Sequence, residues 1–313
     1  MRDACRAGLL ALALLSTPLA GQEMDPLCEA VMYADEEAVA ALLAKGADAN
    51  PVCNGRSALG WAAQTDALGI VRRLVEAGAR LDFVDGVGHT PLRRATDTRK
   101  LEVTKYLLSK GADPNAADRE GRTALLAAVE DGYLEIVPLL LEAKADPNRA
   151  NQDGRTPLMS AVQFRQTALV PLLAAAGADI DATTVLGPPL LMAISDGDPE
   201  LIRAVLEAGA DADARSEFGT PALIAAIEGG ASPEIVALLL AHEADVKARD
   251  QADSTALHAA ARARDTAVVR QLLAAGADPN AAQSNGETPL QTARYNGAPD
   301  EIVAALLEAG ARE

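Results

Sequence analysis

Apolar residues in this chain recur at helical spacing in short segments, and every second segment closes on a tripeptide that resembles Gly-Ala-Asp. These tripeptides begin at Gly46, Gly78, Gly111, Lys144, Gly177, Gly209, Glu243, Gly276 and Gly310. The interval between neighbours is 32 to 34 residues throughout. A domain with one central core has no reason to keep such a period, so the chain is predicted to be an array of about nine like units.

A second mark, Thr-Pro-Leu or a close variant, stands 21 to 23 residues before eight of these tripeptides. A threonine hydroxyl can accept from an unpaired amide at a helix start, and proline at the first helical position has no amide hydrogen to leave unpaired. A helix is therefore predicted after each mark, including the one at Thr220. The second apolar segment of each unit predicts a second helix that ends at the glycine of the tripeptide. The turn-forming residues between units predict a hairpin.

The period, the Thr-Pro-Leu opening, second segments such as Glu135-Ile136-Val137 and the Gly-Ala-Asp close together resemble the ankyrin repeat, over residues 25–313. The resemblance implies an all-α ankyrin-repeat solenoid of about nine helix-turn-helix units with connecting hairpin loops. The domain would span residues 22–313, with the first and last units as caps. It also implies a non-catalytic scaffold that binds a partner protein through a concave groove and its hairpin tips.

Several units depart from the family pattern. The family's histidine after Thr-Pro-Leu is present only as His258, so hydrogen bonds that tie neighbouring repeats are expected to be missing elsewhere. Its place is taken by Gly60, Arg93, Leu126, Met159, Leu191, Leu223 and Gln291. Lys144 and Glu243 occupy the left-handed cap position of glycine, at a cost of about 1 kcal/mol each. Pro138 and Pro171 are predicted to lie inside second helices, where each would remove a hydrogen bond and bend the helix.

Residues 1–21 are predicted to be a secretory signal peptide, because Arg2 and Arg6 precede an apolar run at 9–15 and a small-residue segment at 16–20. The apolar run is too short to span a bilayer stably, and an uncleaved anchor is the alternative. Export predicts a periplasmic or secreted protein, and resemblance to extracytoplasmic bacterial ankyrin proteins favours the periplasm. The alternative function is a secreted effector or toxin-associated protein that acts on a host or competitor target.

Cys28 and Cys53 remain once the signal peptide, with Cys5, is removed. Cys28 lies at the start of the first helix and Cys53 in the hairpin after the first unit, two places that pack side by side in a stack. In an oxidising compartment they are expected to form a disulfide worth roughly 3 to 4 kcal/mol. The alternative is a pair of buried thiols.

The chain is strongly acidic, with a net charge of −17. The predicted signal peptide holds two arginines and one aspartate, so its removal leaves −18. Such a chain repels nucleic acid and anionic lipid, and with 3% aromatic residues it lacks a stacking platform for single strands. The predicted partner is a protein with a basic or mixed surface. Neither nucleic-acid binding nor stable membrane insertion is expected, and the chain is predicted to be a monomer.

No group of residues predicts catalysis, a metal site or a cofactor. His89, His242 and His258 fall at three different repeat positions, a hairpin tip, a second-helix end and the family's structural site, and no nucleophile accompanies them. No glycine-rich loop joins a strand to a helix to hold phosphate, and no further cysteine or histidine completes a zinc site. The chain is therefore predicted not to be an enzyme. The rival hypotheses are an enzyme hidden in the groove and a purely structural role.

The hairpin tips and the ends of the first helices are the predicted partner-binding positions. Phe164 is the predicted centre, with Arg155 and Arg165 beside it and Arg122 one unit away, because aromatic and arginine side chains are the usual hot spots. The alternative for Phe164 is that it folds back over the turn at 163–166. The other predicted contact residues are Arg119, Glu130, Asp131, His89 and Phe218.

Overall fold

The structure, a computed structural model, describes residues 24–184 and 187–312. It divides after Asp153 into two compact parts, called the first and second units, each of which contains several of the repeats predicted from the sequence. The predicted signal peptide, residues 1–21, lies outside the described residues.

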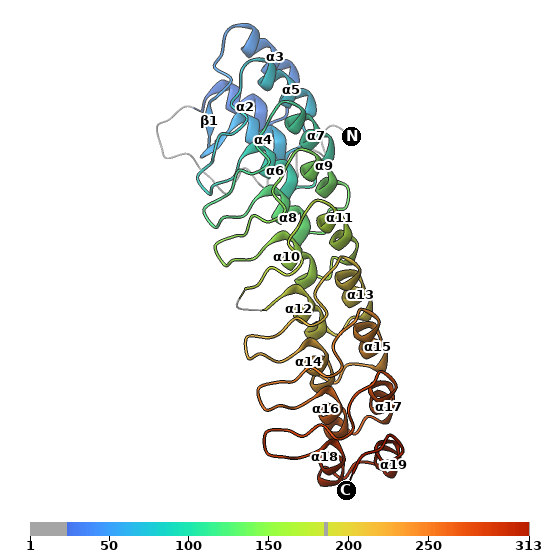
Figure 1. Cartoon of the computed structure of the whole chain (residues 1–313). Coiled ribbons are helices and arrows are strands. Elements are labelled where there is room, and N and C mark those ends of the chain that lie inside the picture. Colours follow the sequence, from blue (N-terminus) through green and yellow to red (C-terminus); the bar gives the residue numbers. More distant parts are fainter. Residues whose placement is uncertain (1–23, 185–186, 313) are drawn as a thin grey trace. The chain divides into compact units, whose positions relative to one another are not determined.

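Each unit is built from helix-turn-helix repeats, four in the first unit and five in the second (Figure 1). The first helices of the repeats are α2 (Pro26–Met32), α4 (Ala58–Gln64), α6 (Pro91–Asp97), α8 (Ala124–Glu130), α10 (Pro157–Gln163), α12 (Pro189–Asp196), α14 (Ala222–Glu228), α16 (Ala256–Ala263) and α18 (Pro289–Tyr295). The second helices are α3 (Glu36–Ala44), α5 (Leu68–Glu76), α7 (Leu101–Ser109), α9 (Ile136–Glu142), α11 (Val170–Ala175), α13 (Pro199–Glu207), α15 (Pro233–Ala241), α17 (Thr266–Ala274) and α19 (Asp300–Glu308). The predicted all-α repeat architecture is confirmed.

Within each unit the first helices stack on first helices and the second helices on second helices, while the hairpins project from the first-helix side (Figure 1). The leucine of the opening mark fills the space between stacked first helices. Leu59, Leu92 and Leu125 in the first unit are at most 1% exposed. Burying one such side chain contributes about 1.5–3 kcal/mol, and only the neighbouring repeats can cover it.

The hairpins set where each first helix begins. In the first hairpin, β1 (Val52–Cys53) pairs with β2 (Arg56–Ser57), and later hairpins close on single bridges such as Ala117 to Thr123. Thr123 is then the helix cap, and its hydroxyl accepts from the Leu126 amide at 3.2 Å.

The helix predicted to begin after Thr220 starts one residue later. The corresponding bridge joins Arg215 to Pro221, so Pro221 takes the cap position and α14 begins at Ala222, without a side-chain cap. The spacing between the two bridged residues is the same in both hairpins, from Ala117 to Thr123 and from Arg215 to Pro221. The pairing within the hairpin therefore decides where the helix begins, and it overrides the local Thr-Pro signal. The family's histidine position in this repeat is Ile224, not Leu223.

The two prolines lie in second helices as predicted, but the expectation that each removes a helical hydrogen bond is wrong. Pro138 is the third residue of α9 and Pro171 the second residue of α11, which follows the 3-10 turn η1 (Thr167–Leu169). Amides of the first helical turn have no partner within the helix, so proline there removes no hydrogen bond. The prolines instead accompany short second helices, of 7 and 6 residues against 9 in α7.

The left-handed cap positions of Lys144 and Glu243 are confirmed. Their φ angles are 69° and 67°, against 86° to 98° for the glycines that occupy this position in the other repeats. A side chain with a Cβ is strained there, so these two caps are destabilising relative to glycine.

Hydrogen bonds between neighbouring repeats are more numerous than the missing histidines predicted. His258 contacts the Glu287 carbonyl of the following repeat through Nε2 at 3.1 Å. Arg93, at the same helix position in the first unit, donates from Nη1 to the equivalent carbonyl, that of Arg122, at 3.0 Å. The expected loss of this bond is therefore wrong at Arg93, because a longer donor reaches the same acceptor.

Asparagine side chains make a second set of inter-repeat bonds beyond the second helices. The Asn50 amide donates to the Gly78 carbonyl at 3.3 Å and its oxygen accepts from the Arg80 amide at 2.7 Å. Asn280 makes the same pair of bonds to Gly310 and Arg312. The asparagine after Gly-Ala-Asp-x thus satisfies the open carbonyl at the end of the next second helix.

Candidate functional site: the hairpin and first-helix surface

Exposed apolar side chains gather on the hairpins and at the ends of the first helices. Seven of the eleven large exposed hydrophobic side chains among the described residues lie there: Tyr33, Val52, Val84, Val87, Phe164, Phe218 and Tyr295. The other four are Met24, Leu134, Leu172 and Leu307. The second helices, which make up the other long surface of each unit, contribute only Leu172 and Leu307. The two surfaces therefore differ in chemistry.

In the second unit this surface is hollowed. A pocket of about 240 Å³ lies between the ends of α12 and α14 and the hairpin that precedes α14. Leu191, Ile194 and Ala225 supply apolar lining, Phe218 comes from the hairpin tip, and Ser195, Ser216 and Glu217 supply polar groups. The Phe218 side chain is 69% exposed, so most of its area is available for contact.

In the first unit the same surface holds a charged cluster around Arg93, which is 4% exposed. Arg93 pairs with Asp97 on its own helix, Nε to Oδ1 at 2.5 Å, and with Asp118 of the next hairpin at 3.4 Å. His89 lies between the same two carboxylates, at 3.3 Å from Asp97 and 3.8 Å from Asp118. Each charge has an opposite neighbour at the junction of two repeats, so removing one partner would leave a buried charge uncompensated.

Burial lowers the pKa of His89, and the charges of Arg94 and Arg93 act in the same direction, while Asp97 opposes them. The pKa of Asp85, at the start of this hairpin, is also lowered, but for a different reason. Burial alone would raise the pKa of Asp85, but hydrogen bonds from Arg94 and from the His89 and Val87 amides hold it below its usual value. His89 is therefore part of the packing of the hairpin.

These geometries agree with comparisons with known proteins. A family model described as "Ankyrin repeats (3 copies)" matches residues 27–118, 114–184, 190–283 and 254–313, most of the chain. The chain belongs to the ankyrin-repeat family. The human ASB11 ankyrin repeat domain, known from a crystal structure, is similar at 27% identity and a TM-score of 0.57, over 70% of this chain and 98% of that one. No curated protein matches. Ankyrin repeats are in general protein–protein interaction modules, and the fold is typically a non-enzymatic scaffold.

Four of the predicted contact residues lie together in the first ankyrin unit, at one hairpin and the end of the helix that follows it. Arg119 is exposed near the hairpin tip, and Asp131 is the C-terminal cap of α8. Arg122 and Glu130 form an ion pair with each other. This pair was not foreseen, and it occupies the charges that were expected to face a partner.

The predicted centre at Phe164 falls in the second ankyrin unit, whereas Arg122 belongs to the first. Phe164 caps the C-terminal end of α10 and is 45% exposed. Arg165 bonds Asp196 of the next repeat, with Nη2 to Oδ1 at 2.8 Å. Arg155 precedes the other end of α10, roughly 13 Å away along the helix axis at 1.5 Å per residue. The backbones of Phe164 and Arg155 therefore lie at opposite ends of α10.

The three histidines of this ankyrin chain occupy three different repeat positions, as the sequence predicted. His242 caps α15, and His258 forms a capping box with Thr255 at the start of α16. Within the described ranges, no cluster of three or more histidine, cysteine, aspartate or glutamate side chains is placed to hold a metal ion. No helix in the described part of the chain is long and apolar enough to cross a membrane.

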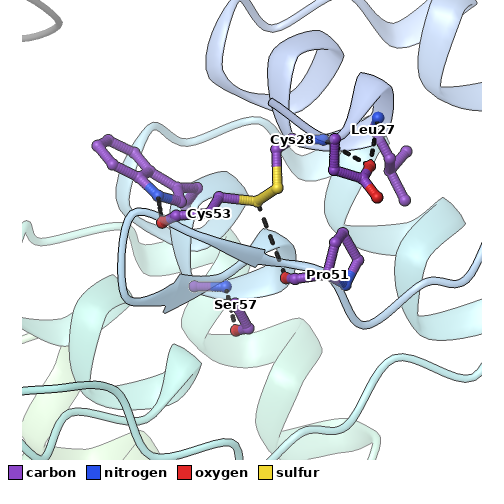
Figure 2. The surroundings of a disulfide bond; sticks show 8 residues. Leu27, Cys28, Pro51, Cys53 and Ser57 are labelled. Atoms are coloured by element: carbon purple, nitrogen blue, oxygen red, sulfur yellow. Dashed lines mark hydrogen bonds between the residues drawn. A yellow bond between two sulfur atoms is a disulfide. The ribbon is translucent and has the colours of Figure 1, made fainter. Parts of the chain in front are cut away.

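The sulfur atoms of Cys28 on α2 and Cys53 on β1 meet, and Figure 2 shows the two side chains in contact. The S–S distance is 2.05 Å and the Cα atoms are 5.4 Å apart. Both residues are at most 2% exposed. The Trp61 indole donates to the Cys53 carbonyl at 2.8 Å, which holds the hairpin against α4. The two cysteines are therefore close enough to link the first helix and the first hairpin covalently.

Proposed function

We propose that this ankyrin-repeat protein is a non-catalytic scaffold that binds a partner protein through its hairpin tips and first-helix ends. The observation that carries the proposal is the gathering of seven of the eleven large exposed hydrophobic side chains on that surface. Apolar and aromatic side chains that remain exposed on a folded protein are typical of interaction sites. A role limited to structure gives no reason for their concentration on the hairpin side of each unit.

Affinity capture from the native cell envelope with the chain from Gln22 to Glu313 tests this function. A hairpin-side bait carries Phe164→Ala, Phe218→Ala and Tyr295→Ala, and a control bait carries Leu172→Ala and Leu307→Ala on second helices. All five side chains are exposed, so neither bait should lose stability. The proposal predicts a protein that the wild-type and control baits retain and the hairpin-side bait loses. Retention by all three baits, or by none, contradicts it.

We further propose that the protein works outside the cytoplasm, in the periplasm or after secretion. Two features support this: the signal-peptide pattern of residues 1–21, and a pair of cysteines placed to form a buried disulfide, a bond that persists in oxidising compartments. Cell fractionation followed by thiol alkylation tests both at once. The expected result is a shortened chain in the periplasm with no alkylated cysteine. A chain found mainly in the medium would favour the secreted-effector alternative, and a full-length cytoplasmic chain with free thiols would refute export.

The charge of the chain suggests the partner's surface. With a net charge of −17, the protein should associate fastest with a basic or mixed surface, and added salt should slow that association by screening. Stopped-flow association rates at low and moderate ionic strength test this. Rates that do not change with salt would remove the argument for a basic partner.

A further inference from the structure

We propose that the pocket around Phe218 binds one short segment of the partner, in which a bulky apolar side chain stands next to a lysine or arginine. This inference rests on the proposed scaffold function and specifies the chemistry of the segment bound at one place. It depends on three properties of the pocket: its volume, the identity of the hairpin residue, and the charge at its rim.

The volume favours a single side chain over a metabolite. The pocket measures about 240 Å³, below the roughly 300–1,000 Å³ of typical small-molecule sites. Leu191 and Ile194 are 8% and 9% exposed, so they present little area from the floor, whereas Phe218 offers most of its ring. An inserted apolar side chain would cover the exposed face of that ring, which is the gain expected of a hot spot.

The aromatic residue is particular to this repeat. Phe218 precedes Gly219, which has a φ of 75° at the hairpin tip, and the equivalent left-handed positions in the next two repeats are Asp253 and Gly286. The residues before those positions are Ala252 and Asn285. The small Ala225 and Gly229 on the α14 side leave the space open next to the ring. The aromatic wall of the pocket is therefore a local specialisation of one hairpin.

The charge at the rim favours a cation. Glu217 is exposed beside Phe218, and its carboxylate makes no ion pair among the described residues. An arginine of the same hairpin and one of the following repeat are already engaged. Arg262 pairs with Glu228 at 2.9 Å, and Arg215 donates to the Gly219 and Arg249 carbonyls at 2.8 and 2.9 Å. A lysine or arginine of the partner can reach Glu217 and also lie over the Phe218 ring.

Selection of random short peptides displayed on phage, against the immobilised chain from Gln22 to Glu313, tests the proposal. The expected peptides share a large apolar residue next to lysine or arginine. They should bind the Leu172→Ala control as they bind the wild type, and Phe218→Ala should weaken them about tenfold or more. Glu217→Gln should weaken them about two- to fivefold, since exposed ion pairs contribute little. Selection on Glu217→Arg should instead enrich acidic peptides.

Several outcomes overturn the proposal: no enriched peptide, enriched peptides that ignore Phe218, or acidic peptides on the wild type. A Phe218-dependent dimer in light scattering would show that the occupant is a second copy of the chain. Circular dichroism melting confirms that each variant is folded, as the exposure of both side chains leads us to expect. If the hairpin-side bait loses a partner that the Phe218→Ala chain still captures, the scaffold function stands and only the pocket assignment fails.

Discussion

Reducing the Cys28–Cys53 disulfide should loosen the first repeat and leave the rest of the chain folded. Among the described residues, α2 packs on α3 and on α4 of the second repeat. The bond to Cys53 adds a covalent tie from α2 to the hairpin on its other side. Repeat arrays lose structure locally when one unit is weakened, because each unit contacts only its neighbours.

The magnitude follows from the sequence separation of 25 residues between the two cysteines. Closing a loop of this length removes about 12 cal/mol/K of entropy from the unfolded chain, or about 3.5 kcal/mol at 25 °C. Each 1.4 kcal/mol corresponds to a factor of ten in an equilibrium constant. Local opening of the first repeat should therefore become about 300-fold more frequent on reduction.

Hydrogen–deuterium exchange measured by mass spectrometry gives the test. Amides of residues 26–57 should exchange faster in the reduced protein, by up to that factor, while amides of α16 should be unchanged. The Cys28→Ala, Cys53→Ala double variant serves as the control, since its exchange should resemble the reduced protein and ignore reductant. Equal exchange in oxidised and reduced protein would refute the reasoning. Faster exchange spread over all repeats would also refute it, because the loss would then be global.

Three further predictions concern stability. Lys144→Gly and Glu243→Gly should each raise the free energy of unfolding by about 0.5 kcal/mol, since relief of left-handed strain exceeds the entropy cost of glycine; lower melting temperatures would contradict this. Arg93→Met should lower that free energy by about 3–5 kcal/mol in urea unfolding, because it removes the buried cation that faces Asp97 and Asp118; a loss under about 1 kcal/mol would show that solvent compensates these carboxylates. Burial lowers the pKa of His258, so the folded protein refuses a proton that the unfolded chain accepts below the ordinary value of 6.5. Stability should fall as pH drops through that value, and His258→Gln, which keeps the cap as Gln291 does, should flatten the profile; an unchanged profile would count against this account.

Most of the fold could be predicted because the period repeats the same local signals. A threonine hydroxyl, a proline and a left-handed glycine each act within a few residues, so the sequence reports them directly. The errors arose where a longer-range constraint decided the outcome. Thr220 lost the cap position to Pro221 because the hairpin pairing sets the register. Arg93 was interpreted as the loss of a histidine, although its longer side chain reaches the same carbonyl.

The surface of the candidate site was predicted better than its details. Repeat position alone assigns Phe164 and Phe218 to a helix end and a hairpin tip, and both are exposed there. The pocket beside Phe218 could not be predicted, because its volume depends on side-chain sizes from two helices and a hairpin. The Arg122–Glu130 pair was also missed, since both residues were taken as facing a partner. The sequence did offer a signal for this pair. Arg122 lies at the end of a hairpin, and Glu130 lies eight residues later at the end of the following helix.

Site-specific photocrosslinking in native cells tests most directly whether the hairpin side is the binding surface. Benzoylphenylalanine would replace Glu120 or Glu217 on hairpins, and Glu142 or Glu207 on second helices, all of which are exposed. The account predicts that irradiation joins a specific protein to the chain from a hairpin position, and that the second-helix positions give no such adduct. The same adduct from second-helix positions, or adducts from these alone, would contradict it.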